Sequence, residues 1–142
     1  MTLDISPFSA CDALISVMVA VSVSDTNVRT SELLAIERMV DHMPVFADYD
    51  ADRIRAISQT VMTLFEEEDG LDALFGLVRD ALPERLYETA YALACDVAAA
   101  DGRLSDDEAE FLREIRYELN VSRLHAAAIE LSAQLRHRTL QT

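Results

Sequence analysis

The sequence is poor in glycine and proline, the two residues that most often interrupt helices. It contains three of each in 142 residues, and no proline lies inside a segment with helical periodicity. Because loops and turns depend on these residues, their scarcity predicts helices throughout the chain. The length fits one domain, and a hydrophobic fraction of 51% is enough for a sizeable core. We therefore expect a single all-α domain spanning residues 1–142.

The chain also lacks the segments that direct proteins to membranes. Residues 1–9 contain Asp4 and no basic start, unlike a signal peptide. The longest apolar stretch, residues 13–23, is interrupted by serines and is too short to span a bilayer. Cys11 and Cys95 form no metal-ligand pattern and lie among apolar residues, which favours reduced, packed thiols. We therefore expect a cytoplasmic protein with no direct insertion into a membrane.

Basic residues are few. The chain has 12 basic and 26 acidic residues, and its formal net charge is −14. This charge repels phosphate backbones and argues against nucleic acid as a partner. It favours metal cations or a basic protein surface, although an acidic surface also serves simply to keep a protein soluble.

Hydrophobic residues recur with helical periodicity over seven segments. The predicted helices cover residues 9–24, 30–43, 51–67, a short segment around 74–78, 83–100, 105–120 and 122–137. Two segments, residues 10–23 and 87–100, are hydrophobic nearly all round, so we expect them to form the buried central pair. The predicted N-caps are Ser9, Asp50, Ser105 and Ser122.

A short acidic pattern occurs twice, with a separation of 76 residues. Each copy follows a run of small and apolar residues and has an acid, an apolar residue three positions on and a second acid seven positions on. The copies are Asp25, Val28 and Glu32, and Asp101, Leu104 and Glu108. The repetition predicts a duplication of halves, roughly residues 9–44 and 83–120, related by a pseudo-twofold axis.

The second copy resembles the back half of a calcium-binding EF-hand loop, D-G-x-[IL]-S-x-x-E. Val97 and Ala99 occupy earlier ligand positions and cannot bind a cation, so an ordinary EF-hand is excluded. Four carboxylates brought together across the pseudo-twofold axis would form an oxygen-rich site for Ca²⁺, Mg²⁺ or Mn²⁺. The candidate metal ligands are Asp25, Glu32, Asp101 and Glu108, with Asp96 in support.

Helix capping is the alternative explanation for these acids. Ser105 and Glu108 have the S-x-x-E spacing of a capping box. In the first copy Arg29 stands at the position of Ser105, yet Glu32 is kept. An acid that is kept without its capping partner indicates another task, although Thr30 could cap one residue later.

No other group of residues in the sequence has the spacing of a catalytic or ligand-binding site. His42, His125 and His137 are scattered among polar helix positions, as surface histidines are. No spacing typical of a nucleophilic triad and no glycine-rich phosphate loop is present. The sequence therefore predicts no catalytic residues.

The motif, the duplication and the helix count together resemble the TerB family, the tellurite-resistance TerB-like domains that also form the N-terminal module of some DnaJ-like proteins. The resemblance covers about residues 10–138 and rests on Asp96, the Ala-Ala-Asp-Gly run ending at Gly102, Leu104, Ser105 and Glu108, and the fainter first copy. The first copy departs from the pattern, with Thr26 matching Gly102 and Arg29 matching Ser105.

The resemblance implies an all-helical bundle with acidic residues gathered near its symmetry axis. It also implies a non-enzymatic module of tellurite and other stress responses, with metal binding and a protein partner in a membrane-associated complex. Two other functions compete with this one. A carboxylate–metal hydrolase would need a base beside an acidic turn, and none is obvious. A plain scaffold would use the acids only as caps and form a homodimer through exposed apolar or arginine-bearing faces.

Overall fold

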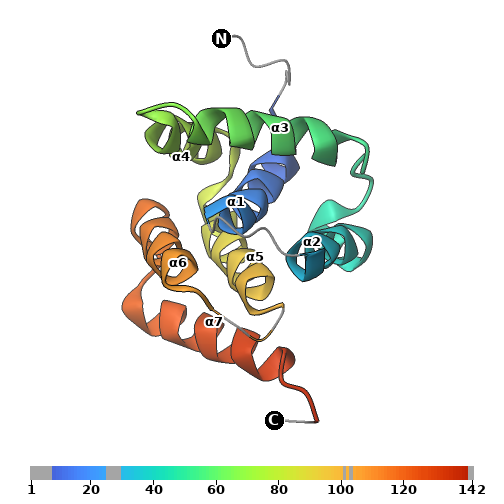
Figure 1. Cartoon of the computed structure of the whole chain (residues 1–142), viewed down its shortest axis with the longest axis vertical. Helices are drawn as coiled ribbons and strands as arrows, with labels where there is room; N and C mark the ends of the chain where they lie inside the picture. Colours follow the sequence, from blue (N-terminus) through green and yellow to red (C-terminus); the bar gives the residue numbers. More distant parts are fainter. Residues whose placement is uncertain (1–7, 25–29, 101, 103, 141–142) are drawn as a thin grey trace.

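The computed structural model describes residues 8–24, 30–100, 102 and 104–140. Within these residues there are seven α-helices, two short 3₁₀ turns and no strand, which confirms the predicted all-α class (Figure 1). The helices are α1 Ala10–Ser24, α2 Thr30–His42, α3 Arg53–Phe65, α4 Gly70–Ala81, α5 Tyr87–Ala99, α6 Asp106–Glu118 and α7 Arg123–Arg136; the 3₁₀ turns are η1 Pro44–Phe46 and η2 Glu84–Leu86. No helix in this part of the chain is both long and apolar enough to cross a membrane.

Three expected details differ from the structure. The helix expected as a short segment around residues 74–78 is the 12-residue α4, which begins at Gly70. Asp50 does not cap α3: its Oδ1 atom accepts a hydrogen bond from the Asp52 amide at 3.0 Å, in the turn that precedes the helix. The helix expected from residue 83 is divided, because Pro83 is followed by the turn η2 and α5 begins only at Tyr87.

The helices α1 and α5 form the centre of the molecule, as their all-round hydrophobicity predicted. Figure 1 shows α3 and α4 above this pair, α2 and α6 on either side, and α7 below. Every residue of α1 from Asp12 to Ser22 is buried. Helices α2 to α6 all pack against α1, whereas α5 packs against α1, α2, α6 and α7. Because each side of α1 is covered by a neighbour, its sequence needs no polar face.

Helices α2 and α6 each pack against both central helices, an arrangement that a pseudo-twofold axis between α1 and α5 would produce. Helix α1 packs against α2 and α6, and α5 packs against α6 and α2. Helices α2 and α6 begin at Thr30 and Asp106, which keep the 76-residue separation of the acidic pattern. The duplication itself stays a prediction, because residues 25–29, 101 and 103 lie outside the described part of the chain.

A buried carboxylate fixes the first turn of α1 to the segment that leads into α3. Ser9 caps α1 as predicted: its Oγ accepts from the Asp12 amide at 3.0 Å, and its own amide donates to Asp12 Oδ2 at 2.9 Å. Asp12, which is 0% exposed, also accepts from Tyr49 Oη at 2.7 Å and from Arg53 Nη2 at 2.6 Å. Burial acts to raise the pKa of Asp12, but the hydrogen bonds from Arg53, Ser9 and Tyr49 outweigh it and lower this pKa to about 2.

Gly70 allows α3 and α4 to meet at a sharp corner. A Cβ atom at this position would lie 1.5 Å from the backbone oxygen of Leu64. Only a residue without a side chain fits so close an approach. A Cβ atom at Gly76, six residues later in the same helix, would meet no atom within 4 Å apart from the neighbouring backbone of the helix itself.

We expect Asp12→Asn to lower the free energy of unfolding at pH 7 by about 2–3 kcal/mol, because an aspartate with a native pKa near 2 contributes that much when it is ionised. A depressed pKa adds stability above the unfolded-state value, near 4, and this stability is lost as the pH falls towards 2. Urea unfolding of both proteins from pH 7 to pH 2 should therefore show the difference shrinking with acid. Asp52→Asn, at an exposed neighbouring position, is the control, and a constant difference at all pH values would contradict this account.

The two glycines of α4 should respond in opposite directions to alanine. Gly70→Ala should destabilise the fold by about 2 kcal/mol or more, since the backbone of Leu64 must move. Gly76→Ala should stabilise it by about 0.5–1 kcal/mol, because alanine favours a helix interior. Thermal unfolding of the two variants measures both effects, and equal shifts would show that the corner does not depend on Gly70.

Candidate functional site

Glu32 and Glu108 are the two members of the predicted acidic set that the structure buries completely. Each is 0% exposed, and each is the third residue of its helix, α2 or α6. The positive end of a helix dipole lies at these first turns and stabilises a carboxylate there. The matched position and burial indicate that the two side chains have equivalent places in the fold.

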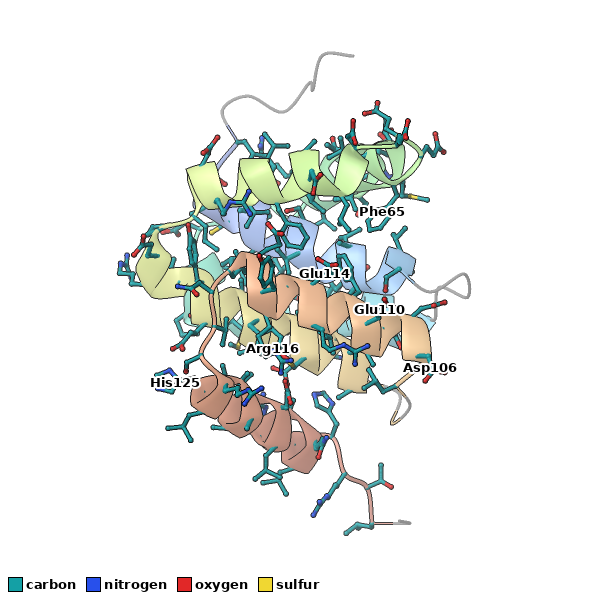
Figure 2. All side chains as sticks on the ribbon, turned by 90° about the vertical axis from the view of Figure 1, so that its left-hand side faces the viewer. Phe65, Asp106, Glu110, Glu114, Arg116 and His125 are labelled. Atoms are coloured by element: carbon teal, nitrogen blue, oxygen red, sulfur yellow. The ribbon has the colours of Figure 1, made fainter. Side chains whose placement is uncertain are left out.

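Both glutamates lie at one end of the molecule. Helices α1 and α5 run in the same direction, so their carboxyl-terminal ends reach the same side, where Asp106 marks the start of α6 (Figure 2). Helix α2 begins six residues after α1 ends, and α6 begins seven residues after α5 ends. The two acidic turns of the sequence therefore lead into helices that start at a shared end.

The capping box predicted at α6 is confirmed. Ser105 Oγ accepts from the Glu108 amide at 3.1 Å, and the Ser105 amide donates to Glu108 Oε1 at 3.2 Å. This reciprocal pair satisfies two amides at the helix terminus. Glu108 thus has a structural task, whatever else its carboxylate does.

Asp25 and Asp101, two of the predicted metal ligands, lie outside the described residues, so their part in a metal site stays a prediction. Within the described part of the chain, no group of three or more His, Cys, Asp or Glu side chains is placed to hold a metal ion. A metal at this end would therefore need oxygen ligands beyond those described.

Asp96, the fifth residue predicted to support a metal, joins α5 to α7. Its Oδ1 atom accepts from Arg136 Nη2 at 2.6 Å and lies 3.3 Å from His137 Nε2. The Asp96 side chain is 14% exposed, and this contact fixes the end of α7 to the central helix. Its support of a metal remains a prediction beside this observed role.

Sequence reasoning did not identify a cavity of about 600 Å³ between α5, α6 and α7. Its walls include small residues from different segments, which leave space where their helices meet: Cys95, Ala98, Ala99, Gly102 and Ala133. The alanine-rich composition of α5 is the only sequence signal for it. Burial raises the pKa of the Cys95 thiol to about 12, so this wall carries a neutral thiol and no reactive thiolate.

The chain was compared with families and with known proteins. A family model described as tellurite resistance protein TerB matches residues 11–131. No curated protein and no solved structure shows significant similarity to the chain. The match includes both copies of the acidic pattern and covers five of the seven helices, α2 to α6, in full.

We expect Ser105→Ala to lower the free energy of unfolding by about 1 kcal/mol, the usual effect of losing an N-cap oxygen. Ser122→Ala is the matched comparison, since Ser122 Oγ accepts from the His125 amide at 3.2 Å in the cap of α7. Urea unfolding of the two variants should give similar losses. No loss for Ser105→Ala beside a normal loss for Ser122→Ala would mean that the capping box at α6 adds no net stability.

Proposed function

The chain belongs to the TerB family, and from this premise we propose that it is a non-enzymatic, tellurite-resistance-type module that binds a divalent cation. In this proposal the cation site lies at the end of the molecule where α2 and α6 begin. The observation that carries the proposal is the complete burial of Glu32 and Glu108 at matched helix positions. Burying an ionised carboxylate is costly unless hydrogen bonds or cations compensate for it.

The chemistry of the donor set selects the class of metal. Carboxylate oxygens are hard ligands and suit Ca²⁺, Mg²⁺ or Mn²⁺ better than metals that favour sulfur or nitrogen. Glu32 and Glu108 would supply two oxygens, and Asp25 and Asp101 would supply the others. The net charge of −14 favours cations in the same way. It disfavours direct binding of tellurite, which is an oxyanion.

We place this cation in a regulatory role, in which its binding changes how the module engages a protein partner. A helix start whose buried carboxylates are neutralised by a cation is stabilised relative to the metal-free form. Stress resistance would then act through the partner and not through chemistry on tellurite itself.

A structural scaffold is the second candidate function, and the capping box of Ser105 and Glu108 favours it. In that function the acids stabilise helix starts and bind no metal. The two candidates differ in one measurable property, the dependence of stability on divalent cations.

Metal-stripped protein should melt at a higher temperature with Ca²⁺, Mg²⁺ or Mn²⁺ than without. A ligand present at 100 times its Kd adds about 2.7 kcal/mol, which corresponds to about 5–10 °C for a domain of this size. Glu32→Gln combined with Glu108→Gln should abolish this rise. Glutamine also completes a capping box, so the change removes charge while the cap of α6 is kept.

Exposed acids on the same two helices provide the control, namely Glu37→Gln combined with Glu110→Gln. This pair makes the same change in net charge and should keep the metal response. No rise with any metal would assign the buried glutamates to the scaffold function. A rise that survives Glu32→Gln with Glu108→Gln would place the cation elsewhere and contradict the proposed site.

A further inference from the structure

Helix α7 is attached to the rest of the molecule by one face only. Its fully buried residues are the small Ala126 and Ala133, which face inward. Polar contacts hold the flanks of the helix: Tyr91 and Arg116 donate to Glu130, His125 contacts Glu88, and Arg136 contacts Asp96. In Figure 2, side chains on the lower side of α7 project away from the other helices.

The outer face of α7 is apolar. Leu124, Leu131 and Leu135 are 77%, 53% and 50% exposed, and Ala128 is exposed between them. These four residues, called the α7 seam below, are spaced by four, three and four positions. Such spacing is that of a coiled-coil seam, in which apolar residues of two helices interlock. A surface helix ordinarily turns its leucines inward, and here the inward face holds Ala126, Ala133 and the half-buried Ile129 instead.

We propose that the α7 seam binds the α7 seam of a second copy of this chain in antiparallel orientation. The spacing is the same when read in either direction, as a twofold interface requires. Leu124 would then lie opposite the partner's Leu135, and Ala128 opposite the partner's Leu131. An alanine facing a leucine lets the two helices approach closely near the twofold axis.

The residues beside the seam favour a second copy over another occupant. Flanking positions in coiled coils often carry charges that select the partner. Here they hold His125, Ala127, Ser132 and Gln134, so no carboxylate or arginine opposes pairing with an identical helix. An anionic lipid surface or an acidic peptide would be bound by a row of cations along the seam. Arg136 instead contacts Asp96 of its own chain.

The net charge of the chain also favours α7 as the surface for self-association. Two chains of net charge −14 repel each other. Helix α7 contains a single acidic residue, Glu130, and its carboxylate already accepts hydrogen bonds from Tyr91 and Arg116. The α7 seam is therefore a surface through which two acidic copies can approach with little local repulsion.

One pair of helices makes a small interface. Interfaces below about 1,200 Å² in total belong to weak and transient complexes. The dimer is therefore a concentration-dependent one, and it is independent of the metal function proposed above. Sedimentation velocity of the whole chain in a chelating buffer, from about 10 µM to about 1 mM, should show a shift from monomer to dimer.

Leu124→Glu should weaken the dimer at least about tenfold, because two buried glutamates would face apolar side chains. Leu33→Glu is the matched control, since Leu33 on α2 is also exposed, at 46%, and the charge change is the same. It should leave association within about twofold of the unsubstituted chain. Circular dichroism and melting should be unchanged in both variants, because both leucines are exposed.

Orientation is tested by Leu124→Glu combined with Leu135→Lys. In the antiparallel pair each new glutamate faces a lysine of the partner, and association should recover at low salt. In a parallel pair like charges would meet and association would stay lost. A chain that remains monomeric at about 1 mM, an equal loss with Leu33→Glu, or no recovery in the double variant would overturn the proposal. Binding to anionic vesicles without self-association would also overturn it.

Discussion

Helix α1 is buried on every side from Asp12 to Ser22, and the arrangement of the remaining helices depends on covering it. A helix without a polar face cannot lie at a surface, so five neighbours pack around it and the chain has to return to it repeatedly. Its amino-terminal turn carries a charged side chain into this core. There Asp12 receives hydrogen bonds from Ser9, Tyr49 and Arg53, and these bonds fix the helix to the segment leading into α3.

The same constraint positions the candidate site. Because α1 and α5 are both covered and run in the same direction (Figure 2), their carboxyl-terminal ends lie at the same end of the molecule. The helices that follow begin there, and their third residues, Glu32 and Glu108, fall beneath the surface. An acid at an exposed helix start is compensated by water, whereas the buried Glu32 and Glu108 need hydrogen bonds or cations to compensate for their burial. That requirement links the packing of the core to the proposed binding of a cation.

Several local features of this fold were readable from the sequence, whereas the side-chain contacts between distant segments were not. The caps at Ser9 and Ser105 were predicted because their partners lie three residues away. The other partners of Asp12, Tyr49 and Arg53, lie 37 and 41 residues away, and a sequence pattern does not pair such positions. For the same reason Asp96 was assigned to the acidic set although Arg136, 40 residues on, binds it. Hydrophobicity all round identified α1 and α5 as central, but it could not show that small side chains on α5 and α7 would leave a cavity.

The uneven attachment of α7 has a dynamic consequence. Proteins open locally in cooperative units, and the units with the fewest buried apolar contacts open at the lowest free energy. Helix α7 buries only two alanines fully, whereas α1 buries eleven consecutive residues. We therefore expect amide protons of α7 to exchange with solvent through local detachment of this helix, at a lower free energy than those of the central pair. Such a detachment would expose more of the Cys95 wall of the cavity between α5, α6 and α7, so we expect the reactivity of this thiol towards a thiol reagent to follow the opening of α7.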